Sequence, residues 1–199
     1  MIVIIDYGVG NLGSVKNTLD RLSIESVISD DSKIIKKSDA LILPGVGSAN
    51  QGMKNLIKRK LDSVILREIQ KGKPFLGICL GMQLLFSFSE EGNTSCLNII
   101  KGKVRKFSSE YKIPQIGWNT IQSTNKNRFF GKIPNNSQFY FVNSYYCIPE
   151  DRSLTIATAE YGVNFCSILN MKNIVATQFH PEKSGEVGQQ FIINWTKLW

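Results

Sequence analysis

Histidine is almost missing from this sequence: His180 is the only one among 199 residues. The chain also has no run approaching the ~20 apolar residues that a membrane-spanning helix needs, so we expect no membrane partner. The apolar start, residues 1–13, carries neither a basic leader nor a small-residue cleavage site. We therefore expect a first strand there rather than a signal peptide, and a cytoplasmic protein.

Cysteine is sparse as well, and in the cytoplasm we expect the four thiols to stay reduced. They are Cys79, Cys96, Cys147 and Cys166. The net charge is +8, yet the sequence lacks a long basic arm or a basic motif interleaved with aromatics. We therefore expect no nucleic-acid partner and interpret the lysines as a solvated surface, with room for a patch that meets an acidic partner or a phosphorylated substrate.

Internal repeats, low-complexity segments and linkers are also absent, so residues 1–199 are expected to form a single domain. No metal or cofactor is predicted. The first half alternates strand-like and helix-like segments, which predicts an α/β fold with a mainly parallel sheet and helices on both faces. The expected strands are Ile2–Tyr7, Ser26–Ile28, Asp39–Leu43 and Pro74–Ile78. The expected helices are Ser14–Leu22, Gln51–Lys71 with a break near Lys58, and one that starts over Gly81–Phe86.

The second half reads differently, with strand-like runs separated by hairpin signals at Tyr161–Asn164 and Met171–Asn173. This predicts an antiparallel portion added to the sheet. The expected strands are Ile99–Phe107, Gln138–Cys147, Thr155–Glu160, Phe165–Leu169 and Ile174–Phe179, followed by a closing amphipathic helix over Gly185–Leu198.

The sharpest motif is the segment Gly77–Gly81, which follows an expected strand and precedes an expected helix. It has the G-x-S-x-G spacing of a nucleophile elbow, with Cys79 in place of serine. Small residues two positions on either side let the backbone turn tightly, and free amides at the start of a helix favour the reactive thiolate. An isolated cysteine is more often a buried core thiol, but this spacing favours a nucleophile.

A nucleophilic thiolate needs a partner that accepts and donates protons. Any Cys–His pair within this chain must include His180, because no other histidine is present. His180 follows an expected strand, and Pro181 stiffens its link to Glu182, whose carboxylate can orient the imidazole. Cys79, His180 and Glu182 are therefore the predicted catalytic residues. A surface histidine in a polar loop is the plainer alternative for this segment alone.

Chemistry at a carbonyl carbon also needs donors for the developing oxyanion. The turn Pro44–Gly47 follows another strand of the same expected sheet, and its glycines leave backbone amides accessible. We predict that the amides of Val46 and Leu80 form the oxyanion hole. An ordinary strand-to-helix turn is the alternative.

Together these motifs resemble the class I glutamine amidotransferases, a family with a Cys–His–Glu triad. The extended elbow, residues 77–83 (GICLGMQ), is similar to the nucleophile signature of that family. More narrowly, the chain resembles the glutaminase subunits of imidazole glycerol phosphate synthases, from histidine biosynthesis. That resemblance spans Asp6 to Ser184 and rests on further motifs at Asp6–Leu12, Leu43–Gly47, Gly117–Asn119, Tyr140–Val142 with Ser144–Tyr145, and His180–Ser184.

The resemblance implies a flavodoxin-like fold and glutamine as the substrate, hydrolysed to glutamate and ammonia through a cysteine thioester. It implies that Gly47, Gln83, Ser144 and Tyr145 hold the glutamine. In the family, the ammonia passes to a (β/α)8-barrel cyclase subunit in a heterodimer. That cyclase converts a phosphorylated ribulosyl precursor to imidazole glycerol phosphate and an aminoimidazole carboxamide ribotide.

Three further residues match family positions that face this partner: Asn11, Trp118 and Lys183. Each also has a plainer interpretation. Asn11 suits a turn, Trp118 suits a core, and Lys183 suits a solvated surface. Both interpretations stay open for each residue.

Two positions depart from the family's pattern. Gln115 and Asn143 stand where the family usually has histidine, in Pro-His-Met-Gly-Trp-Asn and Val-His-Ser-Tyr respectively. Both flank the site or the partner-facing surface, so they bear on the partner more than on the chemistry. Paralogous subunits that supply ammonia to a surface-sugar amidotransferase are therefore an alternative. A non-catalytic regulatory module on the same fold is another, although the complete Cys79, His180 and Glu182 set argues against it.

Overall fold

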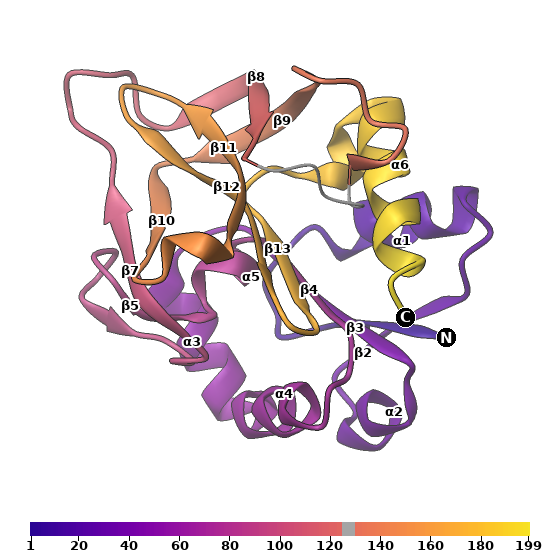
Figure 1. Cartoon of the computed structure of the whole chain (residues 1–199). Helices are drawn as coiled ribbons and strands as arrows, with labels where there is room; N and C mark the ends of the chain where they lie inside the picture. The colour runs from indigo at the N-terminus through magenta and orange to yellow at the C-terminus, as the bar shows by residue number, and fades with distance from the viewer. Residues whose placement is uncertain (125–129) are drawn as a thin grey trace.

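A computed structural model describes residues 1–124 and 130–199, and a sheet of 13 strands forms its centre (Figure 1). The strands are β1 (Ile2–Ile5), β2 (Ser26–Ser29), β3 (Ala40–Gly45), β4 (Phe75–Cys79), β5 (Phe86–Ser89), β6 (Thr94–Ser95), β7 (Ile100–Lys106), β8 (Gln115–Ser123), β9 (Gln138–Asn143), β10 (Tyr145–Pro149), β11 (Thr155–Glu160), β12 (Asn164–Met171) and β13 (Ile174–Thr177). The helices are α1 (Leu12–Arg21), α2 (Ser32–Lys37), α3 (Ala49–Lys58), α4 (Leu61–Gln70), α5 (Leu80–Gln83) and α6 (Gly185–Thr196), with short 3-10 turns η2 (Arg152–Leu154) and η3 (Pro181–Lys183).

The parallel half of the sheet has the strand order β2-β1-β3-β4-β13. Strand β1 is buried on both faces: Ile2 and Ile4 enter one core, and Val3 and Ile5 enter the other. Helices α1 and α6 cover the first face, and α2, α3 and α4 cover the second, as Figure 1 shows. This arrangement confirms the predicted parallel sheet flanked by helices. It also explains why β1 is a continuous apolar run, since helices cover both of its faces.

The carboxyl ends of these parallel strands share one edge of the sheet, where the loops that follow them meet. Strands β3 and β13 lie on either side of β4, with Gly45 in register with Cys79 and Thr177 in register with Ile78. The predicted oxyanion turn, the elbow and the His180 segment therefore start from three neighbouring strands.

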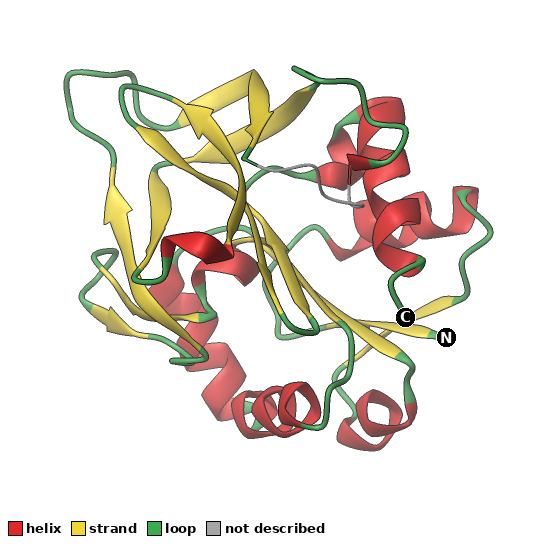
Figure 2. Cartoon of the chain, in the orientation of Figure 1, coloured by secondary structure: helices red, strands yellow, loops and turns green. Residues whose placement is uncertain are grey.

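Beyond β13 the sheet becomes largely antiparallel, and helices α3 and α5 lie beside its β5 and β6 end (Figure 2). The hairpins predicted around Gly162 and Lys172 join β11 to β12 and β12 to β13. Strand β10 connects β12 to β7, while β8 and β9 branch from β11. In the described residues β10 and β12 pair at a single position, Cys147 with Cys166, so the sheet begins to divide there.

Several element predictions need correction. The run Gln138–Cys147 belongs to two strands, because Ser144 interrupts the extended conformation between β9 and β10. The helix expected to start over Gly81–Phe86 is the single turn α5, and Phe86 already begins β5. Strand β8 and helix α2 were not predicted. The break within Gln51–Lys71 is confirmed, since Arg59 and Lys60 separate α3 from α4. Across the described ranges, the helices are too short or too polar to cross a membrane.

Candidate active site

Cys79 occupies a strained turn between β4 and α5. Its backbone has φ +53° and ψ −107°, a conformation that costs a non-glycine residue free energy and is typical of functional sites. The flanking glycines make the turn possible. A Cβ on Gly81 would lie 1.8 Å from the Leu43 carbonyl oxygen, and one on Gly77 would lie 3.0 Å from the Gly81 oxygen. The glycine spacing that predicted an elbow thus has a direct steric reason.

The helix after the elbow is shorter than the sequence predicts. Helix α5 has four residues, Leu80–Gln83, so its aligned peptide dipoles are few and its macrodipole is small. The helix therefore stabilises the negative charge of a Cys79 thiolate less than the full helix that we expected from the sequence. Other donors around Cys79 therefore matter more.

His180 and Glu182 are brought together as predicted. His180 Nδ1 lies 2.8 Å from Glu182 Oε1, and both side chains are buried. The backbone fixes the histidine independently, because His180 N donates to the Tyr140 carbonyl oxygen at 2.9 Å and Ser184 Oγ donates to the His180 carbonyl oxygen at 2.6 Å. With Nδ1 engaged by the carboxylate, Nε2 is left for the sulfur and the substrate.

The electrostatics of this group keep the imidazole protonated. Burial alone would lower the pKa of His180, but the charge and hydrogen bond of Cys79, and those of Glu182, raise that pKa to about 10. At neutral pH His180 therefore carries the proton that a leaving group needs.

A pocket of about 240 Å³ opens beside these groups, and both halves of the sheet contribute to it. Nine of the predicted site residues line it: Val46, Gly47, Cys79, Leu80, Gln83, Ser144, Tyr145, His180 and Lys183. The pocket thus gathers the predicted nucleophile, its proton donor, the oxyanion turn and the predicted substrate-binding residues from segments far apart in the sequence.

The other predicted residues lie outside the pocket lining. Glu182 sits behind His180. Asn11 caps helix α1, where its Oδ1 accepts a hydrogen bond from Ser14 N at 3.3 Å. Trp118 is not a core tryptophan: it is 54% exposed on β8, and its ring makes a T-shaped contact with Tyr140.

The two departures from the family's pattern turn out to be neighbours. Gln115 on β8 pairs directly with Asn143 on β9, and both side chains are buried. Gln115 Oε1 and Asn143 Oδ1 are buried oxygens without a hydrogen-bond partner among the described residues. Asn143 also lines the pocket, so this pair lies directly next to the site.

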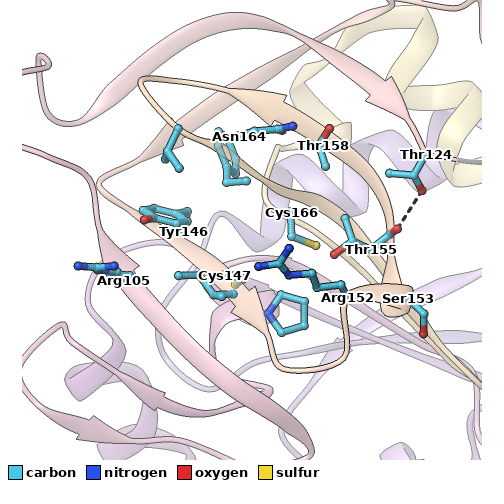
Figure 3. A pocket seen from close by; sticks show the side chains of 14 residues that line it. Arg105, Thr124, Tyr146, Cys147, Arg152, Ser153, Thr155, Thr158, Asn164 and Cys166 are labelled. Carbon is cyan, nitrogen blue, oxygen red and sulfur yellow. Dashed lines mark hydrogen bonds between the residues drawn. The ribbon is translucent and has the colours of Figure 1, made fainter.

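A larger cavity, about 710 Å³, opens where β10 and β12 diverge (Figure 3). Its lining includes Arg105, Arg152 and the facing thiols of Cys147 and Cys166. None of the predicted site residues lines it. Size alone therefore does not mark the candidate active site, which the smaller pocket contains.

The family model for class I glutamine amidotransferases matches residues 3–197. The chain belongs to the class I glutamine amidotransferases. In this amidotransferase the match spans both halves of the sheet, so the antiparallel portion is part of the family's domain.

Full-length relatives narrow the comparison. A protein of Dehalococcoides mccartyi (strain CBDB1) named imidazole glycerol phosphate synthase subunit HisH is 44% identical over 199 residues, covering 100% of this chain and 97% of its own. A protein of the same name from Chlorobaculum tepidum is 45% identical over 201 residues and covers 100% of both chains. A third, named subunit HisH 2, from Methanococcus maripaludis, is 44% identical over 200 residues and covers 99% of both.

Solved structures agree on the fold. PurLQS from Thermotoga maritima has a TM-score of 0.77 at 17% identity, covering 98% of this chain and 97% of its own. A structure described as a glutamine amidotransferase has a TM-score of 0.77 at 15% identity, with 98% and 100% covered. At such identities the likeness concerns the fold, and it confirms the predicted α/β class.

Sequence reasoning missed two polar residues of the amidotransferase site. Glu91 lines the pocket, and its Oε2 accepts a hydrogen bond from Ala49 N at 2.7 Å. Gln178 is fully buried, and its Nε2 lies 3.6 Å from Cys79 Sγ. Gln178 stands two residues before His180, a spacing that could have identified it; Glu91 lies in a polar turn that carries no such signal. In the described ranges no three His, Cys, Asp or Glu side chains group as a metal site.

Proposed function

We propose that this chain is the glutaminase subunit of an imidazole glycerol phosphate synthase, which hydrolyses glutamine to glutamate and ammonia and delivers the ammonia to a cyclase subunit. One observation carries the proposal: Cys79 and His180 converge on one pocket, with Glu182 2.8 Å behind the imidazole. The names of the full-length relatives support the pathway.

The chemistry follows from this geometry. The Cys79 thiolate attacks the carboxamide carbon of glutamine, and protonated His180 gives its proton to the nitrogen as the C–N bond breaks. Ammonia leaves, and a thioester joins glutamate to the sulfur. Neutral His180 then takes a proton from water as the water oxygen attacks the thioester, which releases glutamate and restores the thiolate–imidazolium pair. Glu182 orients the imidazole and stabilises its charged form.

The oxyanion of each tetrahedral intermediate forms between two neighbouring turns. Val46 follows β3 and Leu80 follows β4, and both line the pocket. We assign their backbone amides as the donors. Because Gly45 and Cys79 are in register, the two turns are held at a fixed separation by the sheet.

The pocket also suits a small amino acid. Glu91 is a carboxylate in the lining and can accept hydrogen bonds from the α-ammonium group of glutamine. Gly47, Ser144 and Tyr145 line the same space and present backbone and hydroxyl groups to the rest of the substrate. Gln83 donates through Nε2 to the Tyr145 carbonyl oxygen at 3.2 Å, which ties the elbow to this wall.

The cyclase subunit would cover the mouth of this pocket. Trp118 and Ile116 are exposed on β8, Ile116 by 62%, and Ile116 pairs across the sheet with Val142 of the pocket lining. Exposed large apolar side chains next to a site are typical of partner interfaces. We propose that a (β/α)8-barrel subunit docks here, with Lys183 and Asn11 at its margin, and receives ammonia without release to water.

Removal of the nucleophile tests this function. In the complex with the cyclase subunit, Cys79→Ala should abolish glutamine-dependent synthesis, by about 10⁴-fold or more, and keep synthesis from added ammonium. Cys96→Ala is the matched control, because Cys96 is also a free thiol but lies outside the pocket lining. Residual glutamine hydrolysis by Cys79→Ala at the wild-type rate would refute the assignment.

A complementation experiment shows whether the ammonia goes to a histidine-pathway cyclase or to a surface-sugar synthase. A histidine auxotroph that lacks this subunit should grow when it receives this gene together with the cognate cyclase gene. Failure of growth, with glutamine hydrolysis intact beside a surface-sugar synthase, would instead favour the paralogous role that Gln115 and Asn143 raise. A chain without any thiol labelling by a glutamine-like electrophile would be a non-catalytic module.

A further inference from the structure

The immediate surroundings of the Cys79 sulfur are not all favourable to a negative charge. The Val142 carbonyl oxygen lies 3.7 Å from Sγ, where it can accept a hydrogen bond from a thiol but faces a thiolate with its negative end. Helix α5 is a single turn and contributes a small dipole. A thiolate at this position therefore needs a hydrogen-bond donor besides His180.

Gln178 is such a donor. It is fully buried between the end of β13 and His180, and its Nε2 lies 3.6 Å from Cys79 Sγ. Its backbone is held as well, because Gln178 N donates to the Ser167 carbonyl oxygen at 2.9 Å. The side chain therefore points at the sulfur from a rigid part of the sheet.

The orientation of the Gln178 amide is fixed by its other neighbour. Gln83 Nε2 donates to Gln178 Oε1 at 3.1 Å and to the Tyr145 carbonyl oxygen at 3.2 Å. Because the Gln83 nitrogen can only donate, it must meet the oxygen of Gln178, which leaves the Gln178 nitrogen for the sulfur. An opposite rotation of Gln178 would place two donors together.

We propose that Gln178 stabilises the Cys79 thiolate through this N–H···S hydrogen bond and aims the sulfur at the substrate. The effect of this hydrogen bond on glutamine turnover rests on the proposed glutaminase function. The contact between Gln178 and the sulfur is independent of that function. One strand end thus supplies both Gln178, which holds the nucleophile, and His180, which protonates the leaving group. Gln83 links this donor to the substrate pocket, since it touches Gln178 and lines the pocket.

The other titratable groups around the sulfur come from four further segments: the residues at η3, the segment after β1, strand β10 and the turn between β5 and β6. His180 precedes η3, and Cys79 is among the groups that raise its pKa. Tyr7, after β1, and Cys147, on β10, are buried neighbours whose pKa values are raised, first by burial and then by the charge of Cys79 or other thiols. Glu91 and Lys183 line the same pocket. None of these groups changes in the variants below, so a difference between variants reports on Gln178.

The test measures the alkylation rate of Cys79 by iodoacetamide against pH, followed by mass spectrometry of the peptide that contains Cys79. Gln178→Met keeps the length of the side chain but removes the donor. Because a hydrogen bond to a charged group is lost, we expect the acid limb of the profile to move to higher pH and the alkylation rate at pH 7 to fall by about tenfold or more. Gln178→Glu, which has no donor when ionised and adds a negative charge, should move the acid limb at least as far.

Ser167→Ala is the matched control, because Ser167 is fully buried beside Gln178 and its Oγ has no partner among the described residues. Its alkylation profile should equal that of the wild type. An unchanged profile in Gln178→Met and Gln178→Glu, with native circular dichroism, would overturn the proposal. If Gln178→Met does not fold, an unchanged profile in Gln178→Glu still overturns the proposal, because both the lost donor and the added charge should shift it.

The assay contains neither glutamine nor a partner, so its outcome is separate from the fate of the proposed function. If the wild-type chain hydrolyses no glutamine but the Gln178 variants still shift the Cys79 alkylation profile, the glutaminase proposal is wrong and the Gln178 proposal holds. If glutaminase activity is normal but the profile of the variants is unshifted, the Gln178 proposal is wrong and the glutaminase proposal holds. With both intact, kcat should fall by about tenfold or more in Gln178→Met while KM changes less.

Discussion

The parallel half and the antiparallel extension contribute to the same pocket in different ways. The parallel half supplies the groups that we propose take part in the reaction: Cys79 ends β4, His180 follows β13, and the Val46 turn follows β3. The extension supplies walls, from Val142 on β9 to Tyr145 on β10. The proposed reacting groups thus come from three hydrogen-bonded neighbours, whereas the walls come from β10, farther along the same strand order, and from β9, which lies off that order.

The two regions also differ in how they are packed. Strands β3 and β4 are buried along their whole length, so their ends are fixed by two cores. Strand β8 is buried at Gln115 but exposes Ile116 and Trp118. We infer that the chemistry sits on the rigid half because a misplaced nucleophile loses rate steeply, while the half-exposed extension is free to meet substrate and partner. Four variants break or sharpen this comparison.

The largest effect is expected from Gly81→Ala in the parallel half. The added Cβ would lie 1.8 Å from a backbone oxygen of Leu43, which no rotamer change relieves. We expect a loss of about 3 kcal/mol or more in the free energy of unfolding and no glutaminase activity. Gly13→Ala in α1 is the control: its Cβ meets nothing within 4 Å, so denaturant unfolding should show equal or greater stability.

Glu182→Gln should have the next largest effect, because it keeps the shape of the triad and removes the charge. We expect kcat to fall by about 10²- to 10⁴-fold. The pKa of His180 should also fall from about 10, since Glu182 contributes to raising it after Cys79 does. The alkaline limb of the kcat–pH profile should then move to lower pH.

The same substitution makes a prediction about stability, with a definite sign. A histidine whose pKa is raised on folding, here from 6.5 to about 10, stabilises the fold fully below pH 6.5 and loses that contribution as pH rises through 10. The stability gap between wild type and Glu182→Gln should therefore shrink from pH 6 towards pH 10 and above. Urea unfolding at several pH values measures it, and a gap that grows with pH would contradict the assigned cause.

The parallel half was predictable because each of its signals is local. An apolar run, a tight turn and a helical spacing identify β1, β3 and β4, and the glycine spacing around Cys79 identifies the elbow from sterics alone. The single histidine then limited the choice of a proton donor to His180. These inferences needed no knowledge of which residues lie opposite one another.

The extension was harder because its structure depends on pairing between distant segments. The break at Ser144 and the start of β8 after Pro114 have only weak local signals, and both follow from which strands pair. The contact of Gln178 with Cys79 spans 99 positions of sequence, and the Gln115–Asn143 pairing depends on strand register. Likewise, Trp118 could belong to a core or a surface until β8 placed it on an exposed face.

Trp118→Ala tests the extension as a docking face. We expect the dissociation constant for the cyclase subunit to rise about 30-fold or more, as for a central interface tryptophan. Because Trp118 is half exposed, the melting temperature should stay near that of the wild type. Trp199→Ala is the control, since Trp199 is 46% exposed at the C-terminus, distant in sequence from β8. Equal affinities of both variants would remove Trp118 from the interface.

The smallest predicted effect concerns Glu91, which lies in the turn between β5 and β6 of the extension and lines the pocket. Glu91→Gln keeps an oxygen for Ala49 N but removes the charge that would meet an α-ammonium group. A charged acceptor forms a hydrogen bond about twice as strong as a neutral one, so KM for glutamine should rise about tenfold with little change in kcat.

Glu90→Gln is its matched control: Glu90 is the adjacent carboxylate, lies outside the pocket lining and faces Arg105 at 3.7 Å. If Glu91→Gln instead lowers the melting temperature and kcat together, Glu91 anchors the start of α3 through Ala49 rather than the substrate. A selective rise in KM would mean that substrate recognition depends on the turn between the paired strands β5 and β6 of the extension, whereas the proposed chemistry depends on the ends of the parallel strands.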